Sequence, residues 1–341
     1  MAERGRAWLE RLSRVVARHQ ALFWTLHSVW ALAWGVAFMV VGAKRTWLLR
    51  YGLASIGVVW ATSLVLPALL RGAWVRPERK EGVRRLVLWG QKWLLQGLAF
   101  FILPLYHRSA TYPSGNTLFM ALLLCAALGA TIDVVYDEYV TRWRSLHAAF
   151  LAFVAFACVN LMLPMVWRVG GLTNLAASAA GATAVFLSLW ASPRQGWSPR
   201  GTARVAVAGL AFAGIVAFGR AWVPPAPLRL VSARFGTSLG PDGLDVNAPL
   251  AAIPASRPAR VHVVAAVQAP AGLAEGVRHV WWVDGERVLA TRLITVTGGR
   301  SLGFRSRSSA SLPALSPGQR VRVEVETAWG QLLGRAELPV R

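Results

Sequence analysis

Charged residues are scarce in this chain. They make up 15% of its 341 residues, whereas soluble domains carry about 25%. Hydrophobic residues account for 55%, and the mean hydropathy is +0.45. One soluble core cannot bury so much apolar chain, and a helix needs about 20 apolar residues to cross the hydrocarbon layer of a bilayer. The composition therefore predicts a membrane protein with several spanning helices.

Cysteine and catalytic motifs are equally scarce. Cys125 and Cys158 both lie within apolar runs, so neither a disulfide framework nor a cysteine zinc site is indicated. The motifs of zinc proteases, serine hydrolases, nucleotide-binding loops and dinucleotide-binding folds are absent from the sequence. We therefore favour a non-enzymatic role and expect no metal or cofactor.

Acidic residues are also few, 15 against 37 basic ones, which gives a net charge of +22. Such an excess suggests nucleic-acid binding in a soluble protein. Here the basic residues gather at the ends of apolar runs, as they do in membrane proteins. We therefore expect a lipid bilayer as partner, and no nucleic acid.

Seven apolar runs are long enough to span a membrane. They cover residues 21–41, 48–70, 86–105, 117–136, 146–167, 172–191 and 205–223. Before them, residues 1–20 carry arginines on one helical face and apolar side chains on another. That pattern is typical of a basic amphipathic helix on an anionic leaflet, although an ordinary arginine-rich tail explains it equally well.

The basic residues also predict how the chain is oriented. Sixteen Lys and Arg residues fall in the N-terminal tail and in alternate loops. Five fall on the other side, namely Lys44, Arg45, Arg50, Arg108 and Arg168. Because cytoplasmic loops carry the excess of basic residues, the N terminus is predicted in the cytoplasm and, with seven spans, the C terminus outside. A re-entrant pair at the short hinge 168–171 would reverse the C terminus.

A second domain is predicted over residues 224–341. After a Pro-rich segment, long apolar runs give way to short alternating ones, the period of half-buried strands. Asp284-Gly285 between two such runs is a hairpin signal, and a second hairpin joins 321–325 to 332–338. About seven strands predict an all-β, immunoglobulin-like sandwich. The predicted fold class is therefore a transmembrane all-α bundle followed by a C-terminal β-sandwich.

A bacterial family known as domain of unknown function 2914 is resembled by the segments 279–282, 284–286, 304–306 with Ser308, 317–318, 321–325 and 330–334. Residues 112–175 resemble the polytopic region that often precedes it, domain of unknown function 5924. The resemblance implies a bacterial inner membrane and an exported β-domain, and implies no activity or substrate. Phe304 and Val321 stand where the first family tends to have Trp, which weakens any aromatic binding surface.

Two ionisable residues lie within predicted spans, Lys92 and Asp133. Both are placed near the cytoplasmic face, where they can form an ion pair beside Gln91. Ionisable groups in a span indicate function by default, but a structural pair or a snorkelling lysine explains them too, and we favour that explanation. Asn160 is best interpreted as an interhelical hydrogen-bonding residue.

Two weaker patterns have ordinary explanations. Asp133, Asp137 and Glu138 are formally able to hold Mg²⁺, but an exposed acidic helix end explains them. His27 and His147 are placed near one leaflet, as haem ligands would be, but packing histidines are the favoured interpretation.

Trp281 and Trp282 are adjacent in a predicted strand, so their side chains point to opposite faces and one leaves the core. An exposed Trp indicates a surface for glycan or anionic polymer, through stacking and charge. The other members of this surface would be His279, Arg305, Arg307 and Trp329. The alternative is that one Trp packs in the core and the other covers a sheet edge or lies on the membrane.

Our leading hypothesis is a non-enzymatic inner-membrane protein whose exported β-domain binds a periplasmic protein or glycan. The alternative is a small transporter or membrane enzyme whose site is built from Lys92, Asp133 and Asn160.

Overall fold

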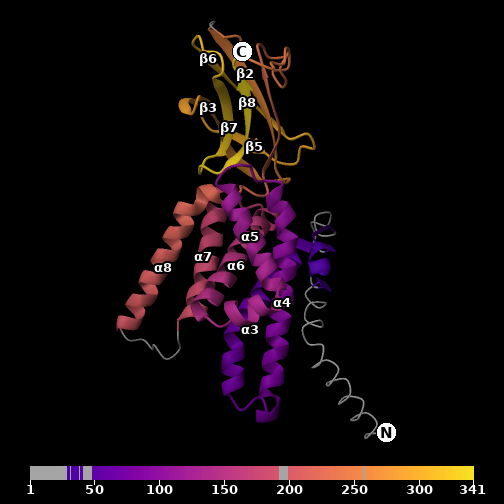
Figure 1. Ribbon diagram of the computed structural model, residues 1–341, viewed down its shortest axis with the longest axis vertical. Helices are drawn as coiled ribbons and strands as arrows, with labels where there is room; N and C mark the ends of the chain where they lie inside the picture. Colours follow the sequence, from indigo (N-terminus) through magenta and orange to yellow (C-terminus); the bar gives the residue numbers. More distant parts are fainter. Residues whose placement is uncertain (1–28, 31, 38, 41–47, 192–198, 256–257) are drawn as a thin grey trace.

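The computed structural model describes residues 29–30, 32–37, 39–40, 48–191, 199–255 and 258–341. Figure 1 shows a helical region and a β region stacked along the longest axis of the molecule. The basic pattern of residues 1–20 lies outside the described residues, as do His27, Lys44, Arg45 and most of the predicted span 21–41.

Within the described residues the helical region is built from long apolar helices. They are α3 (Leu48–Arg71), α4 (Pro77–His107), α5 (Asn116–Thr131), α6 (Arg144–Trp167), α7 (Gly171–Trp190) and α8 (Pro199–Gly219). A π-helical turn, η1 (Val135–Val140), follows α5, and a 3-10 turn, η3 (Arg220–Trp222), follows α8. Five helices are long and apolar enough to cross a membrane, and α5, with 16 residues, is shorter.

Two predicted spans differ from the helices found. The run 117–136 ends early, because the chain leaves the helix at Ile132, whose ψ of 109° is extended, and turns into η1. In contrast, α4 begins nine residues before the predicted start at residue 86. Pro77 suits a first helical turn, and Arg85 forms a salt bridge of 2.8 Å with Glu81 one turn earlier.

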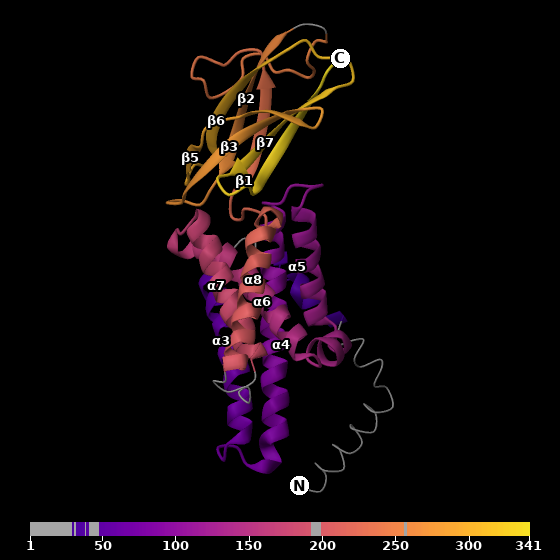
Figure 2. The same cartoon turned by 90° about the vertical axis from the view of Figure 1, so that its left-hand side faces the viewer.

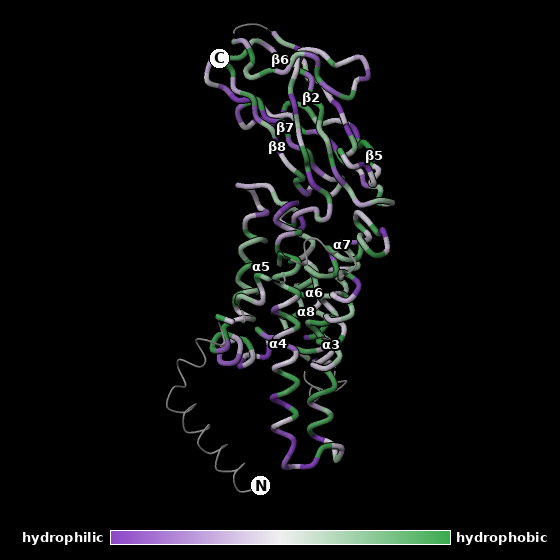
Figure 3. The backbone as a smooth tube through the Cα atoms, turned by 90° about the vertical axis from the view of Figure 1, so that its right-hand side faces the viewer, coloured by the Kyte–Doolittle hydropathy of each residue, from purple (hydrophilic) through white to green (hydrophobic). Residues whose placement is uncertain are grey.

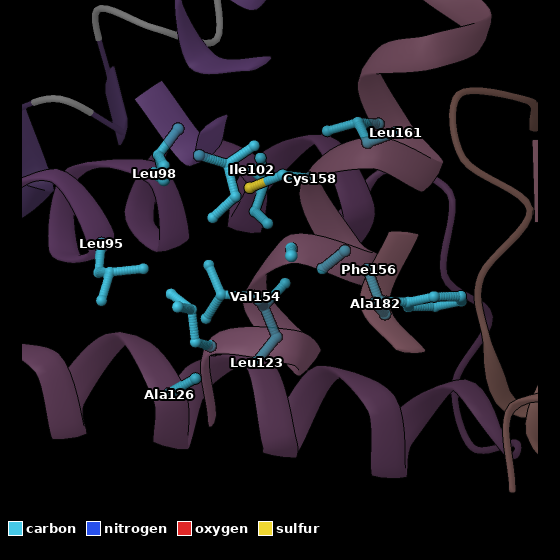
Figure 4. Close-up of a cluster of buried hydrophobic side chains, with 14 of the residues drawn as sticks. Leu95, Leu98, Ile102, Leu123, Ala126, Val154, Phe156, Cys158, Leu161 and Ala182 are labelled. Carbon is cyan, nitrogen blue, oxygen red and sulfur yellow. The ribbon is translucent and has the colours of Figure 1, made fainter. Parts of the chain in front are cut away.

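Helix α6 forms the centre of the helical region. Its apolar face is the most buried of the long helices, and its alanines let neighbouring helices approach closely. Figure 4 shows the resulting core, in which side chains of α4, α5 and α6 meet. Among them are Leu95, Leu98, Ile102, Leu123, Val154, Cys158 and Leu161.

The β region contains two antiparallel sheets. One has the order β1 (Arg229–Gly236), β2 (Ala259–Gln268), β6 (Phe304–Leu312). The other has the order β4 (Glu286–Ala290), β3 (Ala274–Val283), β7 (Arg320–Thr327), β8 (Leu332–Pro339), and β5 (Ile294–Thr297) pairs with β3. Side chains from both sheets share a core that includes Phe235, Val263, Trp281 and Val323.

Both predicted hairpins are present. Asp284 and Gly285 join β3 to β4 with φ angles of 52° and 91°. Two positive φ angles match the twist of a two-residue hairpin. The second hairpin pairs β7 with β8 and turns at Gly330, whose φ is 80°.

Candidate functional site

The β region packs directly on one end of the helical region (Figure 2). The Pro-rich segment between them is buried: Val223 and Ala226 belong to the helical core and Leu228 to the core of the β region. Gln331, after β7, donates from Nε2 to the carbonyl of Val223 at 3.2 Å, and both groups are buried. This contact surface, called the junction below, therefore fixes the two regions to one another.

A buried carboxylate ties the start of α7 to the β region. Glu275 on β3 accepts hydrogen bonds from the backbone N–H groups of Gly171 and Gly276. Gly171 is the first residue of α7 and has a φ of 59°, so a negative charge lies at the positive end of the helix dipole. Burial outweighs these hydrogen bonds and raises the pKa of Glu275.

A large cavity at the junction is lined by four arginines. It has a volume of about 930 Å³, within the usual size of ligand sites. The arginines come from four different elements: Arg50 from α3, Arg108 from the end of α4, Arg168 from the end of α6 and Arg229 from β1. We call this cavity the junction pocket.

The charge of the junction pocket is not balanced by nearby carboxylates. Its lining contains no Asp or Glu, and none of the four arginines forms an ion pair within the described part of the chain. Arg229 donates from Nε to the side-chain carbonyl of Gln268 at 2.6 Å, which orients one guanidinium group. Arg108 and Arg168 cap the C-terminal ends of α4 and α6, where a helix dipole favours a cation.

Of the three polar residues predicted within spans, Lys92 and Asp133 contact one another and Asn160 does not join them. Lys92 forms the expected ion pair with Asp133, and the two side chains are 7% and 15% exposed. Asp133 stands at the break between α5 and η1, which turns its carboxylate toward α4. Gln91 hydrogen-bonds instead to hydroxyls of α3, Thr62 at 2.8 Å and Ser63 at 3.1 Å.

Asn160 lies in a different network. Its side chain donates to the hydroxyl of Tyr106 at 3.1 Å, and Asn174 of α7 donates to it at 3.1 Å. Tyr106 follows Lys92 by fourteen residues on α4, or about 21 Å at 1.5 Å per residue. Lys92, Asp133 and Asn160 therefore do not form one site.

The acidic, histidine and cysteine residues considered as weaker candidates show no sign of a shared site in the described residues. Asp137 and Glu138 are exposed on η1, and His147 packs edge-on against the ring of Tyr136. Cys125 is exposed and Cys158 buried, both as free thiols. No group of three His, Cys, Asp or Glu residues suited to a metal ion occurs in the ranges that the structure describes.

A family model for DUF5924, described as a family of unknown function, matches residues 4–256. The chain belongs to this family. The match is wider than the sequence suggested, because it takes in the whole helical region and β1, and with them all four arginines of the junction pocket. No curated protein matches the chain.

One solved structure that aligns with this DUF5924 member is the Pseudomonas fluorescens alkylpurine DNA glycosylase AlkC bound to DNA containing an abasic site analog. The alignment covers 89% of this chain and 99% of that one, at 11% identity and a TM-score of 0.23. A score that low carries no argument about fold or function.

The aromatic and basic surface predicted for the β region of this DUF5924 protein is dispersed. Trp281 is fully buried and donates to Ser308 at 3.0 Å, and His279 is fully buried beside it. Trp282 leaves the core on the opposite face and lies under the guanidinium group of Arg322, 5.4 Å from the ring centre. Trp281 is therefore the core member of the pair and Trp282 the outer one.

The remaining members of that surface lie elsewhere. Arg305 and Arg307 on β6 donate to the backbone carbonyls of Leu244 at 2.9 Å and Gly243 at 3.4 Å. Trp329 lies at the junction, with its indole nitrogen beside Gly171. These side chains occupy separate parts of the β region and do not form one patch.

Sequence reasoning missed the junction pocket. Arg50, Arg108 and Arg168 were counted only for orientation, and Arg229 and Gln268 had no assigned role. The sequence did contain a signal for this pocket. Of the five basic residues predicted on the non-cytoplasmic side, three stand at the ends of apolar runs that face the β region.

Proposed function

We propose that this protein is a non-enzymatic, multi-pass protein of the bacterial inner membrane, and that its helical and β regions together bind a phosphate-bearing envelope molecule on the periplasmic side. The observation that carries this proposal is the junction pocket, which is lined by four arginines and by no carboxylate among the residues that the structure describes.

The exposed apolar surface of the helices supports insertion in a membrane. In the helix Arg200–Trp222, only 6% of the most apolar 18-residue stretch is buried inside the protein. In Leu49–Arg71 the corresponding share is 11%. In water such helices would expose far more contiguous apolar surface than soluble proteins tolerate, whereas hydrocarbon solvates it. Figure 3 shows mainly hydrophobic residues along the helical region, a mixture of polar and hydrophobic residues in the β region, and polar residues at the opposite end.

The position of the basic residues supports a cytoplasmic N terminus and a periplasmic β region. Helix α7 starts at the junction and α8 ends there, so the other ends of these helices point away from the β region. The α3–α4 turn also lies at that far end (Figure 1). The basic residues of the far end are Arg71, Arg76, Arg79, Lys80, Arg84, Arg85, Arg142, Arg144, Arg200 and Arg204. Positive loops of this kind favour the cytoplasm.

The β region itself fits an immunoglobulin-like sandwich of the kind that domain of unknown function 2914 would supply. Two antiparallel sheets with a shared core and a buried Trp on a central strand support it. A periplasmic protein or glycan bound on its outer face stays a prediction, and Trp282 is the aromatic residue left to carry it.

Guanidinium groups favour phosphate as the ligand chemistry. Arginine presents planar paired donors that bind phosphate oxygens in a bidentate manner. Arg50, Arg108 and Arg168 belong to the helices and Arg229 to the β region, so one bound anion would contact both. The ligand would thereby strengthen the junction as well as occupy it.

Binding of inorganic pyrophosphate to the full chain in neutral detergent tests the proposal. A ligand that binds only the folded state raises the unfolding temperature, so we expect a saturable rise in Tm at constant ionic strength. Arg50→Gln/Arg108→Gln should remove the rise, whereas Arg287→Gln/Arg292→Gln, which deletes the same charge from exposed positions of the β region, should keep it. An equal rise in both double variants would refute the proposal.

Orientation is tested separately by fusions after Arg341. Alkaline phosphatase is active only outside the cytoplasm and a suitable fluorescent protein matures only inside it. Phosphatase activity is the expected result, and fluorescence instead would place the pocket on the cytoplasmic side.

The buried pair of Lys92 and Asp133 favours one second candidate, a transport or proton pathway through the helices. In cells with a phenotype that depends on the protein, Lys92→Met and Asp133→Asn would both fail to rescue it. Full rescue by both variants would eliminate this candidate.

A further inference from the structure

An apolar groove lies directly below the junction pocket, between α3 and α4. It has a volume of about 280 Å³, and apolar side chains form most of its lining. Its lining includes Trp34, Gly52, Trp93, Leu94, Gly97 and Phe101. Such a lining suits hydrocarbon and offers little to a polar ligand.

The groove and the pocket adjoin one another at Tyr51. Tyr51 lines both of them, one residue after Arg50. Along α4, the groove is lined from Trp93 to Phe101, and the pocket from Leu105 to Ser109. An elongated ligand can therefore place an anionic end among the arginines and an apolar end between the helices.

The groove is open on its outer side. Leu94 is 37% exposed and Tyr51 63% exposed on the surface that a bilayer would cover. Gly97 keeps the floor open, because a Cβ added there meets no atom within 4 Å. A lipid chain can thus reach the groove from the side on which Leu94 and Tyr51 are exposed.

We infer that the ligand of the junction pocket is an anionic phospholipid of the outer leaflet, with its phosphate among the arginines and one acyl chain in the α3–α4 groove. This inference rests on the proposed phosphate-binding function. The charge of the pocket alone would also suit a free phosphate compound. The apolar groove next to the pocket is what favours a lipid.

Native mass spectrometry of the full chain in neutral detergent tests the inference with phosphatidylglycerol as probe and phosphatidylcholine as neutral reference. Gly97→Leu fills the groove, and Gly57→Leu is its control, because Gly57 on α3 also has no atom near an added Cβ and does not line the groove. Arg50→Gln/Arg108→Gln removes half of the pocket's arginines. The same variants are titrated with inorganic pyrophosphate by thermal unfolding.

We expect the wild type and Gly57→Leu to retain phosphatidylglycerol over phosphatidylcholine. Gly97→Leu and Arg50→Gln/Arg108→Gln should each lower phosphatidylglycerol retention by about tenfold, the loss of roughly one charge-assisted contact or a few buried methylenes. Gly97→Leu should leave the response to pyrophosphate unchanged.

The two ideas fail in different ways. If Gly97→Leu retains phosphatidylglycerol as the wild type does while the arginine variant loses both probes, the pocket binds phosphate without a lipid chain and the inference is overturned. Equal retention of phosphatidylcholine by the wild type overturns it as well. If the arginine variant loses neither probe, the proposed function itself is wrong.

Discussion

Replacing His279 by glutamine is expected to make the β region less sensitive to acid. The imidazole is fully buried on β3, between the hydroxyls of Ser308 at 2.8 Å from Nδ1 and Ser306 at 2.9 Å from Nε2. A neutral ring satisfies both hydroxyls, because one nitrogen donates and the other accepts. Burial lowers the pKa of His279 from 6.5 to about 4.

The size of the effect follows from proton linkage. Between pH 6.5 and 4 the unfolded chain binds a proton that the folded chain does not, so stability falls as the pH falls through this window. With these two pKa values, the loss relative to neutral pH is about 2 kcal/mol at pH 5 and about 3 kcal/mol at pH 4. Below pH 4 both states are protonated and this contribution to the pH dependence ends.

Hydrogen exchange of β3 and β7 peptides in the full chain measures the effect. Corrected for intrinsic rates, wild-type protection should fall by roughly 30-fold between pH 7 and 5, since each 1.4 kcal/mol is a factor of ten. His279→Gln keeps a hydrogen-bonding side chain without a titrating ring, so its protection should change much less over the same range. Parallel loss in both proteins would show that other groups cause the acid sensitivity.

Three further outcomes are expected. Lys92→Met should lower the unfolding free energy by about 3–5 kcal/mol because it removes the cation that compensates the largely buried carboxylate of Asp133, and adding Asp133→Leu should recover most of the loss in chemical unfolding. Trp281→Ala should cost about 3–5 kcal/mol through a core cavity, and Trp282→Ala clearly less, in thermal unfolding of the full chain. Glu275→Ala should cost about 1–2 kcal/mol and raise exchange in the first turn of α7, because it removes the carboxylate that caps that helix.

A specific result would contradict each of these three predictions. A double variant as unstable as Lys92→Met alone would mean that the charge pair is not the cause. Equal costs at the two Trp positions would contradict their opposite faces. For the helix cap, Glu286→Ala on exposed β4 is the matched control, and equal exchange at α7 in both variants would contradict the assigned contact.

The sequence predicted elements where local chemistry decides them. Asp284-Gly285 permits the positive φ angles of a tight hairpin, and the hairpin is there. The ion pair of Lys92 with Asp133 was also predictable, because a charge among apolar helices is costly unless an opposite charge compensates it. Apolar run length located α3, α6 and α7 to within about two residues.

What the sequence did not predict depends on contacts between distant segments. The early end of α5 at Ile132 coincides with the turn that brings Asp133 to Lys92, a contact between two separate helices. Alternation placed Trp281 and Trp282 on opposite faces without saying which face is covered by the second sheet. The junction pocket combines residues from 49 to 271, and no local pattern links them.

The cap on α7 has a consequence for the order in which the chain is assembled. Gly171 leaves the ribosome more than a hundred residues before Glu275. During synthesis, α7 is therefore made with its first turn uncapped, and the cap is completed only when β3 reaches it. A chain truncated before β3 would keep that uncapped helix end, so completion of the helical region depends on folding of the β region, which is synthesised last.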